Sequence, residues 1–193
     1  MKFEIKMSPE ELVYMAVRCE GENLDYEYVN MMKDVQVRGS IAEEDIIDRI
    51  IEKGLAEENW GDVSFNEIAI EALSPIWNGN FQAIIEIKGR DSIERTIRIH
   101  KKDGRYVIVE KCGDELNVKT ADSEEIEEIA DMLKKENGKF ITLGNLMIDK
   151  GHETIEEFVV KEDQMYRPQG EGNSVLISDA QYTDIAVKTL KGE

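Results

Sequence analysis

The chain has 193 residues, of which 24 are Lys or Arg and 42 are Asp or Glu, so its formal net charge is −18 at pH 7. A negative field of this size repels phosphate and argues against nucleic acids and anionic membranes as partners. The length suits one domain, and we treat residues 1–193 as a single α+β domain.

The N-terminal segment predicts a strand followed by a capped helix. Residues 2–7 alternate charged and apolar side chains, as a short strand does, and they lack the apolar segment of a signal peptide. Ser8, Pro9 and Glu11 then supply an N-cap, a proline at the first helical position and a capping-box glutamate. No apolar run approaches the roughly twenty residues of a membrane span. We therefore expect a cytoplasmic protein without membrane insertion.

An aromatic stretch beyond Gly21 allows two interpretations. Tyr26, Tyr28 and Met31 belong to residue types that suit an adaptable contact surface, but the same types are more often ordinary core residues. The sequence alone leaves both interpretations open.

The next two helices are predicted from apolar stripes. Residues 43–53 carry four isoleucines on one face, and Gly54 ends this helix. Residues 56–63 are expected to form a loop. A capping pattern at residues 64–67 then starts a third helix, which Pro75 is expected to end, because proline disfavours a helical conformation in the residue before it.

Residues 81–120 predict a four-stranded antiparallel meander. Apolar and polar side chains alternate in residues 81–88 and again in the strands that follow. Asp103 and Gly104 suit the positive φ angles of a type I′ hairpin turn, and Gly113 marks a second tight turn. Strands from residues 2–6 and 175–177 are expected to extend this sheet, with helices packed mainly on one face.

The C-terminal third is less regular. A capping box at Asp122 predicts a helix that Asn137 and Gly138 are expected to close. Residues 139–151 show no clean period, and residues 153–166 suit either a helix or a bent strand. Residues 167–173 predict a loop, and Ser178 caps a last helix over residues 178–190. The similar spacing around Ser8 and Ser178 fits either generic capping or a pseudo-two-fold arrangement.

Residues suited to catalysis or metal binding are few and scattered. His100 is expected on the outward face of a strand and His152 in a loop, both solvated. The sequence contains no dinucleotide-binding, P-loop, zinc-protease or EF-hand pattern. Cys19 and Cys112 lie far apart, which favours reduced thiols over a disulfide or a metal site. We therefore expect a protein that is not an enzyme and that holds no cofactor or metal.

The order of helix ends and strands resembles the EspG family of type VII (ESX) secretion chaperones. That family tends to carry an amphipathic helix ending in Gly-Leu, matched by Gly54 and Leu55, and a capped helix ending near a proline, matched by Pro75. Antiparallel strands follow, and a strand before a Glu-Glu-Leu helix opens the chain, as residues 7–17 do here. This chain differs from mycobacterial members in a shorter length and a brief turn at residues 89–92. The resemblance therefore points to a short, non-mycobacterial Gram-positive variant.

The resemblance implies a non-enzymatic cytoplasmic chaperone or adaptor. It would bind a helical effector or toxin of the WXG, LXG or PPE-like type and keep it soluble and competent for export. Contact residues are predicted where apolar side chains lack a regular buried face: Tyr26, Tyr28, Met31, Phe140, Leu143, Phe158 and Tyr166. The alternative, suggested by the charge, is an acidic immunity protein that fills the basic cleft of a nuclease toxin. The oligomeric state stays open.

Overall fold

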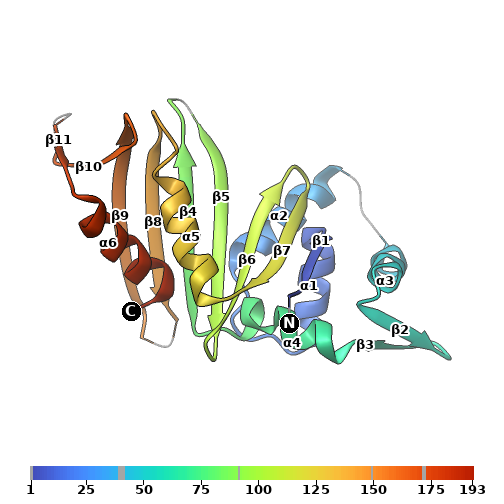
Figure 1. Ribbon diagram of the computed structural model, residues 1–193. Coiled ribbons are helices and arrows are strands. Elements are labelled where there is room, and N and C mark those ends of the chain that lie inside the picture. The colour runs from blue at the N-terminus through green and yellow to red at the C-terminus, as the bar shows by residue number, and fades with distance from the viewer. Residues whose placement is uncertain (1, 39–41, 91, 149, 171–172) are drawn as a thin grey trace.

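The computed structural model describes residues 2–38, 42–90, 92–148, 150–170 and 173–193 (Figure 1). The first half contains β1 (Glu4–Met7), α1 (Pro9–Arg18), α2 (Tyr26–Arg38), α3 (Glu43–Glu52), β2 (Ala56–Asn59), β3 (Asp62–Phe65), α4 (Glu67–Asn78) and β4 (Phe81–Lys88). The second half contains β5 (Ile93–Lys102), β6 (Arg105–Cys112), β7 (Glu115–Ala121), α5 (Ser123–Leu133), β8 (Phe140–Met147), β9 (His152–Lys161), β10 (Gln164–Pro168), β11 (Ser174–Leu176) and α6 (Asp179–Lys191).

Nine strands form one antiparallel sheet in the order β1-β7-β6-β5-β4-β8-β9-β10-β11. The predicted meander is therefore confirmed as β4 to β7, and the terminal strands extend it, β1 beside β7 and β11 at the opposite edge. Asp103 and Gly104 have φ angles of 51° and 75°, as a type I′ turn requires. The α+β class with a large antiparallel sheet is confirmed.

Helices cover both faces of the sheet, and the expectation that they pack mainly on one face is wrong. The reason lies in β6, where Tyr106, Val107, Ile108 and Val109 are all buried. Val107 and Val109 pack in a cluster with α1 to α4, which we call the α1–α4 core, while Tyr106 and Ile108 pack with α5 and α6 in the α5–α6 core. In Figure 1, α5 and α6 lie in front of the sheet and α1 and α2 behind it. A continuous apolar run is typical of a strand buried on both faces.

Three capping boxes start helices as the sequence predicts, at Ser8, Asp122 and Ser178. The two helices capped by serine follow strands at opposite edges of the sheet and pack into opposite cores. A two-fold axis along the central strand β4 would produce this relation, so the architecture is compatible with the predicted pseudo-symmetry.

The segment before and within α4 departs from expectation in three ways. Residues 56–65 form the β2–β3 hairpin instead of a loop, so Ser64 lies in a strand and Asn66 is the N-cap. The helix also continues through Pro75 to Asn78. Proline lacks the N–H that would donate to the carbonyl of Glu71, but the Ser74 hydroxyl donates to that oxygen at 3.2 Å instead.

The irregular C-terminal third is mostly strand. Residues 139–151 contain β8, and the strand alternative for residues 153–166 is confirmed by β9 and β10. Arg167 and Pro168 belong to β10, so the loop predicted at residues 167–173 begins later, and its residues 171 and 172 lie outside the described residues. The sequence of β8 shows no alternation of apolar and polar residues, because both of its faces carry apolar side chains. Ile141 and Leu143 lie on its buried face, and Phe140 and Leu146 lie on the other.

Candidate protein-binding surface

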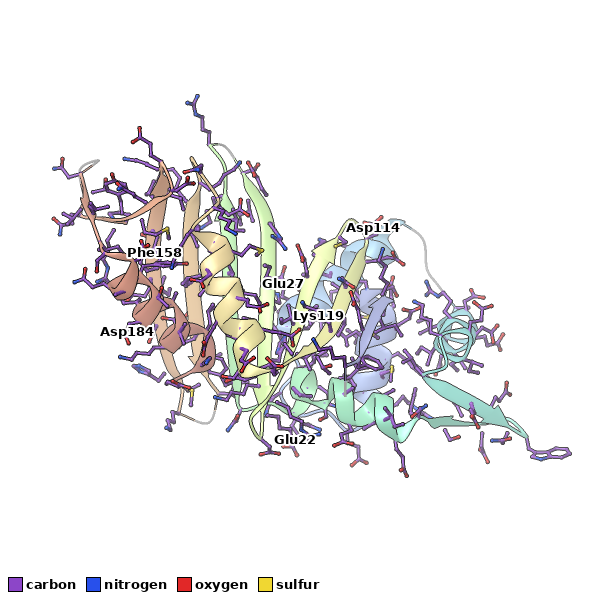
Figure 2. The ribbon with its side chains drawn as sticks, in the orientation of Figure 1. Glu22, Glu27, Asp114, Lys119, Phe158 and Asp184 are labelled. Carbon is purple, nitrogen blue, oxygen red and sulfur yellow. The ribbon has the colours of Figure 1, made fainter. Side chains whose placement is uncertain are left out.

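The helices α1 to α4 cover about half of one face of the sheet, and α5 and α6 cover about half of the other. Two parts of the sheet therefore lie without a helix among the described residues. One part lies on β1 and β7, opposite α1, where the outward side chains are polar: Glu4, Lys6, Asn117 and Lys119. Lys119 is labelled in Figure 2 on this part of the sheet. Such a surface is an ordinary solvent-exposed sheet face.

The second uncovered part is rich in apolar side chains. We call it the open face: the side chains of β4 and β8 to β11 that point away from α5 and α6. Cross-strand pairing places Phe140, Val159, Tyr166 and Leu176 in one row over four strands. A second row contains Ile84, Gly144 and Ile155. The side chains of Phe140 and Ile155 are 50% and 60% exposed. Leu176 is 53% exposed, whereas Val159 is buried at 7%, so Phe140, Ile155 and Leu176 supply the exposed apolar area of the open face. Exposed apolar patches mark interaction surfaces.

A hollow of about 420 Å³ lies where the open face meets the start of α2. Its walls come from α2 and from the strands β4, β5, β8 and β9, with Tyr26, Ile84, Arg98, Gly144 and Leu146 among its lining. Gly144 has no side chain, so the floor of the hollow is open at this position. A Cβ added there would lie 3.5 Å from Cγ2 of Ile84 and would occupy part of the hollow. The hollow therefore continues the apolar rows of the open face towards α2.

A polar network fixes the start of α2 beside this hollow. The Asp25 carboxylate accepts a hydrogen bond from Arg98 Nη1 at 3.1 Å and another from the Gln82 amide. One turn further into α2, Tyr28 Oη lies 2.7 Å from His100 Nε2. His100 is only 2% exposed, so its expected solvation is wrong: α2 covers the face of β5 that was taken to be outward. His152 is exposed, as expected, but it begins β9 and does not lie in a loop.

Burial governs the titration of this network. It raises the pKa of the Tyr28 phenol, and it lowers the pKa of His100 to about 4, against a smaller upward effect of Asp25. Both rings are therefore neutral near pH 7 and share one hydrogen bond. The network contains no charged imidazole at that pH, so its role is to hold α2 in place.

The seven predicted contact residues fall into two groups. Tyr26, Phe140 and Tyr166 lie at or beside the open face, and Tyr26 is 64% exposed. Tyr28 and Met31 pack in the α1–α4 core, and Leu143 and Phe158 pack in the α5–α6 core. Phe158, labelled in Figure 2, meets Tyr182 of α6 edge to face with ring centroids 5.1 Å apart. For these four residues the core interpretation describes their position.

Sequence reasoning did not name five apolar members of the open face: Ile84, Leu146, Ile155, Val159 and Leu176. In these strands, apolar residues also occupy the positions between the buried ones, and this was the signal that the sequence contained. Without the strand register, that signal cannot be separated from ordinary core residues.

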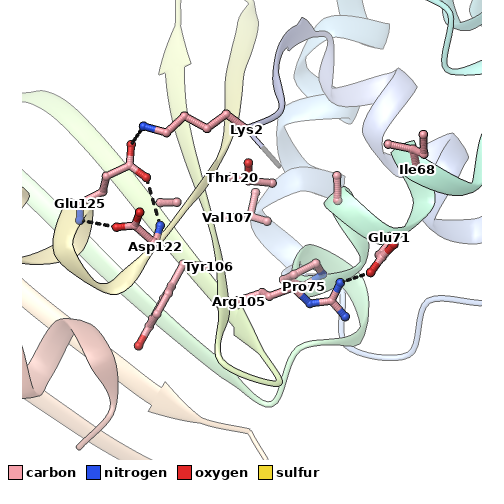
Figure 3. A pocket seen from close by; sticks show the side chains of 12 residues that line it. Lys2, Ile68, Glu71, Pro75, Arg105, Tyr106, Val107, Thr120, Asp122 and Glu125 are labelled. Carbon is pink, nitrogen blue, oxygen red and sulfur yellow. Dashed lines mark hydrogen bonds and ion pairs between the residues drawn. The ribbon is translucent and has the colours of Figure 1, made fainter.

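A larger cavity, of about 460 Å³, lies between α4, the β6–β7 hairpin and the start of α5 (Figure 3). Its floor is apolar, and the charges on its rim pair with one another, Lys2 with Glu125 at 3.4 Å and Arg105 with Glu71. Glu125 and Asp122 also form the cap of α5. Because these rim charges already have partners, we interpret the cavity as a groove between packed elements. Among the described residues, no three His, Cys, Asp or Glu side chains are grouped as metal ligands would be.

No family model matches this chain, and no curated protein matches it. Among solved structures, it is similar to the Mycobacterium tuberculosis type VII secretion system chaperone EspG5, determined in complex with a PE25–PPE41 dimer. The TM-score is 0.61 over 97% of this chain and 95% of that chain, at 9% sequence identity. The predicted EspG-like fold is thereby confirmed. The match extends over nearly all of both chains, so it gives no support to a shortened variant. In the described part of the chain, no helix is both long enough and apolar enough to cross a membrane.

Proposed function

We propose that this protein is a non-enzymatic cytoplasmic chaperone or adaptor that binds a helical protein secreted by a type VII system, and that the open face is its binding surface. The observation that carries the proposal is the open face, with its exposed Phe140, Ile155 and Leu176, on a fold of the EspG type. The structure of the solved neighbour is that of its complex with a PE25–PPE41 dimer, which is consistent with a secreted helical partner of the PPE, WXG or LXG type. A Gram-positive source outside the mycobacteria remains part of the proposal.

The open face suits an amphipathic helix of the secreted protein. Phe140 and Ile155 supply apolar contact area. Glu157 lies in the row between them and Glu153 in the row beyond Ile155, and both favour basic residues beside the apolar stripe of that helix. Arg98 lines the hollow and is 8% exposed, and its Nε has no hydrogen-bond partner among the described residues. Binding hides the apolar stripe of the secreted protein, and the acidic surface keeps the complex in solution.

The test is a double substitution on the open face, Phe140→Asp with Ile155→Asp. The partner is first identified by copurification with the products of neighbouring genes, and its affinity is then measured by titration calorimetry. Two carboxylates buried against an apolar helix should weaken binding by a hundredfold or more, which is about 2.7 kcal/mol. Because both side chains are half exposed, the variant should keep the thermal stability of the original protein.

The matched control changes charge on the opposite face. Glu124→Gln, Glu127→Gln and Glu128→Gln together alter exposed positions of α5 and should leave affinity within a few-fold. If this control loses a hundredfold while the open-face variant binds normally, the acidic-inhibitor alternative replaces the chaperone. The dependence of the affinity on salt concentration distinguishes the two functions independently. Binding by a chaperone through an apolar interface should weaken little as ionic strength rises, whereas binding by an acidic inhibitor should weaken steeply.

A further inference from the structure

The β2–β3 hairpin carries a completely exposed tryptophan at its tip. Trp60 and Gly61 form the turn, and the Trp60 side chain makes no contact that shields it from solvent. Figure 1 shows the hairpin projecting from the body at the end of the molecule opposite β9 to β11. The hairpin is therefore remote from the open face.

The backbone at this tryptophan is also unfavourable. Trp60 has a φ of 57° and Gly61 a φ of 87°, which is the geometry of a type I′ turn. Asn and Gly fit the first of these positions far better than a bulky side chain does. Exposure of an indole and a left-handed backbone both oppose folding stability, so neither explains why tryptophan stands here.

The base of the hairpin is anchored and its tip is not. Ala56 pairs with Phe65, and both belong to or pack against the α1–α4 core, whereas Glu57, Glu58 and Asp62 nearer the tip are exposed. The tip is thus a short, fixed arm with one large aromatic residue among three acidic ones. Tryptophan is the residue type most enriched at binding hot spots, and a pre-ordered turn loses little freedom on binding.

We propose that the β2–β3 hairpin is a docking arm that inserts Trp60 into an apolar pocket of a second protein whose pocket rim is basic. The acidic flank excludes an anionic membrane as the acceptor, and the charge of −18 disfavours a second copy of this chain. The docking arm and the open face are separate, so one molecule holds the secreted protein and the second protein at the same time.

The experiment places a photocrosslinking phenylalanine derivative at position 60 of the full chain in cells, with the same derivative at Ile93 as the control. Ile93 is also an exposed apolar residue beside a turn. The protein crosslinked from position 60 and not from position 93 is identified, purified and titrated with the original chain. We expect Trp60→Ala to weaken its binding by thirtyfold or more, Trp60→Phe to retain part of the affinity, and Glu57→Lys with Glu58→Lys to weaken it strongly at low salt.

Four results would overturn the docking arm: no product specific to position 60, a product with lipid or a second copy, a partner that binds Trp60→Ala as well as the original, or a partner that binds the charge-reversed variant more tightly. The Phe140→Asp, Ile155→Asp variant should bind the second protein normally. Failure of the docking arm is therefore distinguishable from failure of the proposed chaperone function. Trp60→Ala itself should fold at least as well as the original chain, because it removes no buried contact.

Discussion

Replacing Trp77 with alanine is expected to lower the free energy of unfolding by about 3–5 kcal/mol, the cost typical of a large aromatic residue removed from a core. Trp77 lies in α4 and is completely buried in the α1–α4 core. The chain at Gly21 packs directly on it, since a Cβ on that glycine would lie 2.7 Å from the Trp77 Cβ. The Asn23 N–H also donates to the Trp77 carbonyl at 2.8 Å. The substitution leaves a cavity where α4 meets the α1–α2 connection.

Chemical denaturation followed by circular dichroism measures this loss, and the chain contains its own control. Trp60→Ala removes the other tryptophan, whose side chain is exposed, and should leave the midpoint unchanged or slightly higher. Equal losses for the two variants would contradict the packing described for α4.

Acidification is expected to destabilise the protein through His100 by about 3 kcal/mol between pH 6.5 and pH 4. Burial holds the pKa of His100 at about 4 in the folded chain, below its ordinary value of 6.5. In that interval the unfolded chain binds a proton at His100 that the folded chain does not bind, so stability is complete above pH 6.5 and falls as the pH drops towards 4. Asp25, Arg98 and Tyr28 are the charged and titratable groups that face this ring.

Denaturation curves collected across this pH range give the free energy of unfolding of the original chain and of the His100→Gln variant. The glutamine keeps a polar side chain at this position but does not titrate in this range. Carboxylates remote from this ring contribute equally to both proteins, so the difference between the two curves reports the titration of His100 together with its coupling to Asp25. A difference that stays constant from pH 7 to pH 4 would show that His100 does not bind its proton as described.

Features set by a few neighbouring residues could be predicted from the sequence. The three capping boxes and the Asp103–Gly104 turn depend on side chains within three or four positions, and all were found. The meander was also predictable, because short turns join its strands and the alternation in β4 is strict. Such local rules do not hold everywhere: the capping pattern predicted at residues 64–67 fails, because Ser64 lies in β3 and Asn66 caps α4 instead.

Features that depend on distant elements could not be predicted in the same way. The alternation in β5 predicts a solvated His100, but its burial depends on α2, more than seventy positions earlier. Pro75 alone predicts a helix end, but the Ser74 hydroxyl and the packing of Trp77 carry the helix onward. Of the candidate site, Tyr26, Phe140 and Tyr166 were predicted, whereas Ile155 and Leu146 required the register of β8 with β9.

The pairing of β1 with β7 has a consequence for the order in which the chain folds. Glu4 pairs with Lys119, so four helices, the β2–β3 hairpin and the strands β4 to β6 lie between the two partners. Closing so long a loop is entropically slow, whereas β4 to β7 can zip together through adjacent hairpins. We expect the meander to form the folding nucleus and β1 to join after the rate-limiting step. Substitutions at Ile5 should then accelerate unfolding, and substitutions at Ile99 should slow folding, in stopped-flow kinetics.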